Sequence, residues 1–137
     1  MAVIARRTLL ALLFTTSTED DIRNVLASMA TDLSAGNISG FLNLLAKDFP
    51  APDELRQQLV GLTTTYDVNS SVQVQTATGT EEKQSAKVDW YLALRSRTDN
   101  AVAQQRREVL TIEFIKRNKR WRVTSISPIS FFAQNAL

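Results

Sequence analysis

The amino-acid sequence predicts an α+β domain in which three N-terminal helices pack on one face of a four-stranded antiparallel sheet. Two changes in pattern support this prediction. Apolar residues recur every three or four positions before Thr65, and they alternate with polar residues after Tyr66. The length of 137 residues is that of one compact domain. Helices that come first, followed by strands in succession, are typical of α+β folds.

Residues 1–17 differ from the rest of the chain. Arg6 and Arg7 precede the apolar run 8–14, and a Thr/Ser stretch follows. This order resembles a short secretory signal, but it lacks a clear cleavage site, and the run is too short for a transmembrane segment. The alternative is a leading helix that packs Leu9, Leu10, Leu13 and Phe14 on the domain. We therefore expect a domain over 18–137, exported if residues 1–17 are a signal and cytoplasmic otherwise.

Start and stop signals divide the helical part into three. Thr18 is expected to cap the first helix, because the acids that follow it suit the positive end of a helix dipole. Gly36 is expected to end that helix, and Asn37 is expected to cap a second helix that ends at Phe49-Pro50. The buried face of the first helix is expected to comprise Ile22, Val25, Leu26, Met29, Ala30 and Leu33.

The third helix is expected to begin at Ala51-Pro52-Asp53-Glu54, because proline is tolerated in a first turn. Its apolar stripe is Leu55, Leu59 and Leu62, and the β-branched run 63–65 is expected to end it.

Four strands are expected after Tyr66. The first carries Val68, Val72 and Val74, and the second alternates without a break over 86–95. Residues 97–105 are polar and are expected to form a loop. The third strand carries Leu110, Ile112 and Phe114, a turn lies at Asn118, and the last strand runs from Trp121 through Val123 towards Ile126.

The composition excludes most familiar catalytic chemistry. With no Cys and no His, the chain has no disulfide, thiolate nucleophile or histidine-dependent triad, and it lacks the usual zinc ligands. Its acids form no calcium-loop pattern and its glycines form no phosphate loop, so we expect no metal and no cofactor. The net charge is only +2. We interpret the basic run 116–122 as a solvated hairpin tip and expect no nucleic-acid partner, although such a run with one aromatic can bind phosphates.

The final hairpin, in which a charged turn precedes Trp121-x-Val123 and Ile126, resembles that of the nuclear transport factor 2-like, or SnoaL-like, superfamily. The resemblance covers roughly 20–128. It implies a cystatin-like cone, in which a strongly bent four-stranded sheet wraps around the helices and leaves a pocket at its wide end. The superfamily usually carries a short hairpin between the second and third helices. Residues 49–52 cut across at that place, so a pocket wall is expected to be missing.

Enzymes of this superfamily abstract a proton next to a carbonyl, or eliminate water, with an inward Asp or an Asp/His pair. A base of this kind needs a carboxylate in a low-dielectric pocket. Asp89 and Tyr91 alternate with the apolar residues of their strand and are expected to point outward. The remaining candidates for a general base are Asp48, just after the second helix, and Asp67, at the start of the first strand.

The inward-facing residues contain no ionisable group, so they suit either a filled core or a pocket for an apolar molecule. We therefore expect a non-catalytic small-molecule-binding or protein-interaction domain. The alternative is a cofactor-free lyase or isomerase. A homodimer is expected through the outer sheet face, which carries Tyr91, Val109, Thr111 and Ile115. The expected pocket lining is Phe41, Leu45, Trp90, Leu92, Ile112, Phe114 and Trp121.

Overall fold

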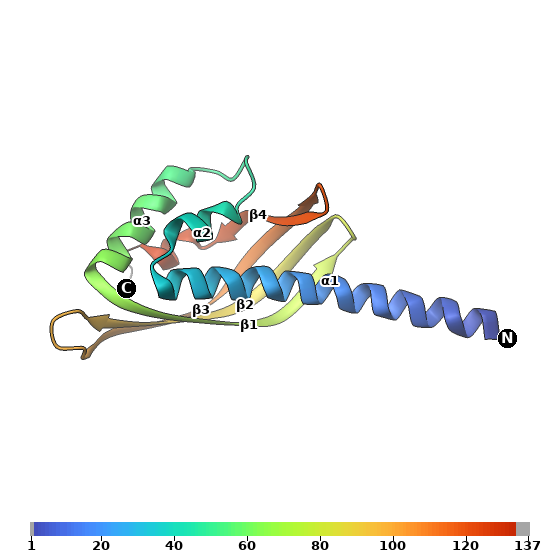
Figure 1. Cartoon of the computed structure of the whole chain (residues 1–137), viewed down its shortest axis with the longest axis horizontal. Coiled ribbons are helices and arrows are strands. Elements are labelled where there is room, and N and C mark those ends of the chain that lie inside the picture. The colour runs from blue at the N-terminus through green and yellow to red at the C-terminus, as the bar shows by residue number, and fades with distance from the viewer. Residues whose placement is uncertain (1, 134–137) are drawn as a thin grey trace.

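The computed structural model describes the backbone of residues 2–133 and the side chains of residues 18–133. Its three helices lie on one side of a single curved sheet (Figure 1), so the α+β prediction is confirmed. The elements in chain order are α1 (Ala2–Ala35), α2 (Ile38–Asn43), α3 (Pro52–Thr65), β1 (Tyr66–Gly79), β2 (Lys83–Ser96), β3 (Val102–Arg117), β4 (Arg120–Ser127) and the 3₁₀ turn η1 (Ile129–Phe132).

Helix α1 is longer than the sequence predicts. It runs without a break from Ala2 to Ala35, so the expected start at Thr18 is wrong. The Thr/Ser stretch before Thr18 contains no glycine or proline, so a helix formed by the preceding Leu-rich run continues through it. The expected packing of Leu9, Leu10, Leu13 and Phe14 lies outside the described side chains. Within the described part of the chain, no helix combines the length and apolar character needed to cross a membrane.

The junction between α1 and α2 follows the sequence prediction. Gly36 has φ 72°, and the N–H of Asn37 donates to the carbonyl of Asp32 at 2.8 Å, which is the bond that closes a Schellman motif. The side-chain oxygen of Asn37 then accepts from the N–H of Gly40 at 3.0 Å and caps α2. These local bonds set the angle at which α2 returns over the sheet.

Helix α2 ends at Asn43, so the expected end at Phe49-Pro50 is wrong. The chain that follows α2 lies along β4. The N–H of Val123 donates to the carbonyl of Leu44 at 2.9 Å, and the N–H of Ala46 donates to the carbonyl of Val123 at 2.7 Å. These backbone groups pair with the open edge of β4 instead of continuing the helix. The edge of β4 is thereby protected by the segment between α2 and α3, where the sequence predicted that the superfamily's usual hairpin is missing.

The four strands form one antiparallel sheet in the order β1-β2-β3-β4. Register shifts lie between Val74 and Thr76, between Leu94 and Arg95, and between Glu113 and Phe114. Such bulges bend a sheet and increase its twist. The helix-facing side chains of the strands join those of α1, α2 and α3 in one buried core.

Strand β3 begins at Val102, so the predicted loop over 97–105 is too long. The backbone bonds to β2 continue through this polar stretch, because a strand ladder needs no apolar side chains to form. Strand β4 pairs with β3 only along 111–117. Residues 102–110 of β3 therefore have β2 on one edge and, within the described residues, no strand on the other.

Candidate functional site

The space between the helices and the sheet is filled by aromatic side chains. Phe41 of α2, Trp90 of β2 and Phe132 of η1 are fully buried. The ring centroids of Trp90 and Phe132 are 5.2 Å apart, and those of Phe41 and Phe132 are 5.8 Å apart, both in edge-to-face arrangements. All seven residues expected to line a pocket lie in this buried cluster: Phe41, Leu45, Trp90, Leu92, Ile112, Phe114 and Trp121.

Phe132 reaches this cluster because the chain turns inward after β4. Pro128 follows the last strand, and η1 then places Phe131 and Phe132 against the core, 4% and 0% exposed. The turn also contacts α3. The C-terminal part of the chain therefore covers the end of the core beside α3 (Figure 1). We define residues 128–133 as the C-terminal plug.

Arg106 connects the plug to the sheet. It is the one buried charged residue among residues 18–133, with 8% exposure. Its Nη1 donates to the carbonyl of Phe131 at 2.9 Å and to that of Ala133 at 2.6 Å. Its Nε and Nη2 donate to the side-chain oxygen of Gln104 at 3.2 and 3.1 Å, which fixes the plane of the guanidinium. Burial lowers the pKa of Arg106, and the guanidinium keeps its charge at neutral pH.

A hollow of about 710 Å³ remains open beside Arg106. It lies at the edge of β3 that has no neighbouring strand, between residues 104–108 and the plug residues Pro128, Ser130 and Phe131. Gln104, Arg106 and Glu108 are paired with Leu94, Leu92 and Trp90 of β2, so all three share the helix-facing side of the sheet. The lining thus combines the buried Arg106, the exposed Arg107 and Glu108, two glutamines and the ring of Phe131.

Comparison with solved structures places this architecture among known folds. A conserved protein from Planctomyces limnophilus superposes with a TM-score of 0.73 and 12% identity, over 81% of this chain and 94% of that one. A nuclear transport factor 2-like protein with a cystatin-like fold, from Novosphingobium aromaticivorans, gives 0.65 and 14%, over 86% and 84%. The chain has the nuclear transport factor 2-like fold.

A proposed scytalone dehydratase from the same bacterium shares this nuclear transport factor 2-like fold, with a TM-score of 0.68 and 10% identity over 82% of this chain and 83% of that one. No protein-family model matches the chain, and no curated protein matches it in sequence. Identities this low establish the fold, and the fold by itself does not determine the activity.

Both candidate general bases lie on the surface of the nuclear transport factor 2-like cone. The side chain of Asp48 is 64% exposed, and its two oxygens each accept from Arg117 at 3.2 Å. The hydrogen bonds from Arg117 lower the pKa of the Asp48 carboxyl. Asp67 is 56% exposed and lies 2.9 Å from the guanidinium of Arg97. Neither carboxylate lines the hollow beside Arg106.

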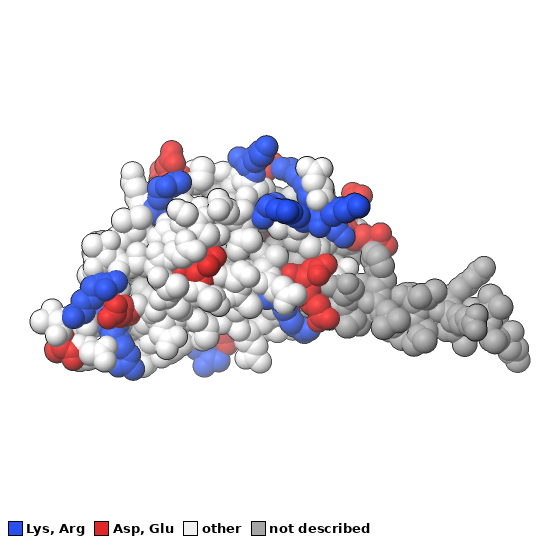
Figure 2. Space-filling view, in the orientation of Figure 1, with Lys and Arg blue, Asp and Glu red and all other residues white. Residues whose placement is uncertain are grey.

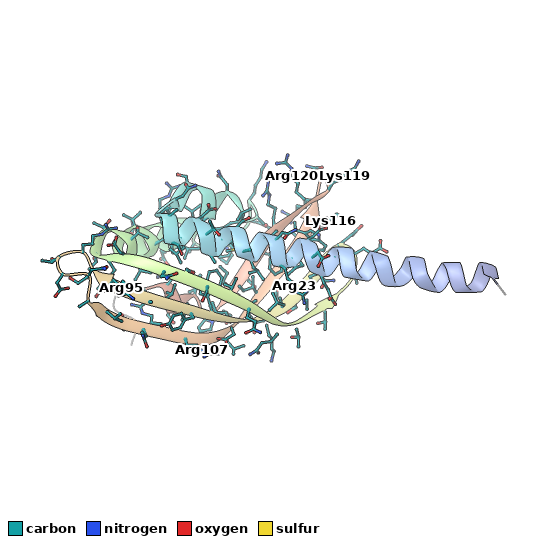
Figure 3. The ribbon with its side chains drawn as sticks, turned by 60° about the horizontal axis from the view of Figure 1, so that its bottom comes forward. Arg23, Arg95, Arg107, Lys116, Lys119 and Arg120 are labelled. Atoms are coloured by element: carbon teal, nitrogen blue, oxygen red, sulfur yellow. The ribbon has the colours of Figure 1, made fainter. Side chains whose placement is uncertain are left out.

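Asp89 forms an ion pair on the outer face of the sheet. Its carboxylate accepts from Arg107 at 2.7 to 3.2 Å, and these hydrogen bonds lower its pKa. Arg107 lies on the side of the sheet away from the helices (Figure 3). Tyr91 is on the same face of β2 and is half-buried. The alternation in the sequence predicted these outward positions.

The basic run forms the tip of the β3–β4 hairpin. Lys and Arg side chains gather around this tip (Figure 2), where Asn118 and Lys119 have φ 52° and 66°, as a tight primed turn requires. Trp121 points inward, 5% exposed, with the ammonium of Lys116 5.9 Å from its ring. The predicted turn at Asn118 is confirmed. The absence of a nucleic-acid partner stays a prediction.

Sequence reasoning missed Arg106 and Phe132. Arg106 lies in the polar stretch that was expected to be a loop, where no apolar alternation revealed an inward position. A signal was nevertheless present. Counting back in twos from Ile112 and Leu110 leads to Glu108, Arg106 and Gln104 on the same face. The pair Phe131-Phe132 near the end of a polar tail was a second signal that this segment returns to the core.

Proposed function

We propose that the chain is a non-catalytic small-molecule-binding domain whose largely apolar ligand binds at the mouth of the cone. The observation that carries this proposal is the chemistry around the hollow of about 710 Å³ beside Arg106. The ring of Phe131 lines it, Phe132 lies behind that ring, and its one buried charged group is the cation Arg106. Small-molecule sites usually combine apolar surface with a few fixed polar groups. Here the polar groups line the hollow, and the apolar surface is the buried aromatic cluster behind Phe131.

The carboxylates favour binding over the alternative, a cofactor-free lyase or isomerase. A base that abstracts a proton next to a carbonyl needs shielding from water to raise its pKa. Asp48 and Asp67 are exposed and paired with arginines. The hydrogen bonds from Arg117 make Asp48 a weaker base than a free aspartate, because they lower its pKa. Glu108 lines the hollow but is exposed.

Native mass spectrometry of the full chain, purified at neutral pH without organic solvent, tests this proposal. We expect a mass above 15.3 kDa, with the difference lost when the same sample is acidified and unfolded. A chain that carries no small molecule, and whose melting temperature no apolar compound raises, would contradict the proposal. Proton exchange next to a carbonyl that is lost in Asp48→Asn or Asp67→Asn would instead support the lyase or isomerase.

The proposal includes a homodimer formed through the outer face of the sheet. The helices cover the other face, and Val102 and Val109 of β3 are 44% and 45% exposed. Val109 lies opposite Asp89, and Tyr91 lies next to it on β2. A second copy on this face would bury these apolar groups together.

A further inference from the structure

The plug is attached to the sheet by side chains rather than by strand pairing. The ladder between β3 and β4 stops at the pair Thr111–Ser127. Beyond it, the N–H of Phe131 donates to the carbonyl of Pro128 at 3.3 Å, and the N–H of Ala133 donates to the carbonyl of Ser130 at 3.0 Å. These bonds lie within the plug. Its bonds to β3 come from the guanidinium of Arg106.

Phe132 fills the space between the helices and the sheet, in the place where the ring of a ligand could bind. Its side chain is fully buried, and its ring meets that of Trp90 at an interplanar angle of 88° and that of Phe41 at 75°. Rings on two different elements, β2 and α2, thus form a slot for one further ring. Trp90 and Phe41 both come from outside the plug, whereas the third ring against Phe132, that of Phe131 at 5.2 Å, belongs to the plug.

The bonds of Arg106 show which polar group suits this slot. The guanidinium binds two carbonyl oxygens from two different residues of the plug. A carboxylate offers two oxygens to the same donors from one group and adds a full negative charge. Charge-assisted bonds of arginine to carboxylates are about twice as strong as bonds between neutral groups. An aromatic ring joined to a carboxylate by a short chain would therefore satisfy the slot and the guanidinium together.

We propose that the plug is exchangeable, and that an aryl-alkyl carboxylate displaces it. Its ring lies between Trp90 and Phe41, and its carboxylate is bound by Arg106. This inference rests on the proposed function and names its ligand class. The hollow beside Arg106 gives such a ligand its approach from solvent. Glu108 is the negative charge on the same side of the sheet, and water screens it because its side chain is exposed.

Calorimetric titration of the full chain with 3-phenylpropionate and with 3-phenylpropionamide measures what the negative charge contributes to affinity, because the two compounds have nearly the same shape. The carboxylate is expected to bind at least about tenfold more tightly than the amide, because one ionic hydrogen-bonded pair contributes at least that factor. The Phe132→Ala variant is expected to bind 3-phenylpropionate at least about tenfold more tightly than the wild type does. The plug ring then no longer competes, and the cavity it leaves accepts the ring of the ligand.

Three arginine variants test the role of the guanidinium. Arg106→Gln is expected to bring the two affinities within about twofold of each other, because the charge-assisted bond is lost. Arg106→Lys is expected to keep part of the preference for the carboxylate. Arg120→Gln, which removes the same charge at the exposed hairpin tip (Figure 3), is expected to keep all of it. Equal affinities in the wild type, or a preference that survives Arg106→Gln, would overturn the inference.

Hydrogen exchange of the wild-type chain tests the displacement without any variant. With saturating 3-phenylpropionate, the amides of Phe131 and Ala133 are expected to exchange faster, because a displaced plug loses the packing against the core that holds its short turn in place. Slower exchange there would overturn the inference, and so would an absence of binding to both the wild type and Phe132→Ala. The proposed function would still stand if native mass spectrometry finds a retained apolar molecule, so the two failures are distinguishable.

Discussion

Trp121 is the residue on which the resemblance of the final hairpin depends most. It is 5% exposed, and its Nε1 has no hydrogen-bond partner among the described residues. Trp121→Ala is expected to destabilise the domain by about 3 to 5 kcal/mol, through lost burial and an unfilled cavity. Trp121→Phe is expected to cost much less, because no hydrogen bond is lost. Chemical denaturation measures both, and an alanine variant as stable as the parent would contradict the observed burial.

The ion pair between Asp89 and Arg107 predicts a pH dependence. Hydrogen bonds from Arg107 hold the folded-state pKa of Asp89 below its ordinary value of 3.8. The pair therefore stabilises the fold above that value, and its contribution is lost as pH falls through the lowered folded-state pKa. In urea unfolding, Asp89→Asn is expected to have a lower midpoint than the parent at pH 6 and an equal one well below pH 3.8. A difference that persists in acid would contradict this account.

A direct titration of Asp89 provides the control. In Arg107→Gln, the pKa of Asp89 is expected to return towards 3.8, as followed by the chemical shift of its carboxyl carbon. Asp48 should keep its lowered pKa in this variant, because its partner is Arg117 on a different part of the surface. If the pKa of Asp89 does not change in this variant, the hydrogen bonds from Arg107 are not what lowers it.

At the scale of single elements, two glycines with positive φ, one at the end of a strand and one at the end of a helix, allow the cost of an added Cβ to be compared. Gly79 ends β1 with φ 149°, and a Cβ there would collide with the carbonyl oxygen of Lys83. Gly36 ends α1 with φ 72°, and a Cβ there would meet open space. Gly36→Ala is expected to cost about 1 to 2 kcal/mol, the strain of the left-handed backbone. Gly79→Ala is expected to cost more. Equal costs in thermal unfolding would contradict the described hairpin.

The elements that the sequence predicts well are those determined by neighbouring residues. Unbroken alternation over 86–95 is sufficient to predict strand β2. Gly36 and Asn37 mark the end of α1 and the start of α2, because their own hydrogen bonds form the caps. The end of α2 could not be predicted, because Leu44 and Ala46 leave the helix to pair with Val123, 77 or more positions away. The burial of Arg106 depends in the same way on a plug that arrives from the end of the chain.

At the scale of the whole molecule, the proposed homodimer predicts a mass of twice 15.3 kDa in light scattering. Val109→Lys is expected to dissociate it, because the substitution places a charge in the middle of the outer sheet face. Val60→Lys is the matched control, since Val60 is 46% exposed on α3, on the helical side of the domain. A monomer at high micromolar concentration would contradict the dimer and leave the ligand site unaffected.

The central claim is that the chain fills its own chamber with Phe132, in the place that a ligand would take. Nuclear Overhauser spectroscopy of the full chain tests it most directly, because the ring centroids of Trp90 and Phe132 are 5.2 Å apart. We predict cross-peaks between the indole protons of Trp90 and the ring protons of Phe132 in the ligand-free protein, and their loss when 3-phenylpropionate saturates the site. A ligand-free protein without these cross-peaks would contradict the account.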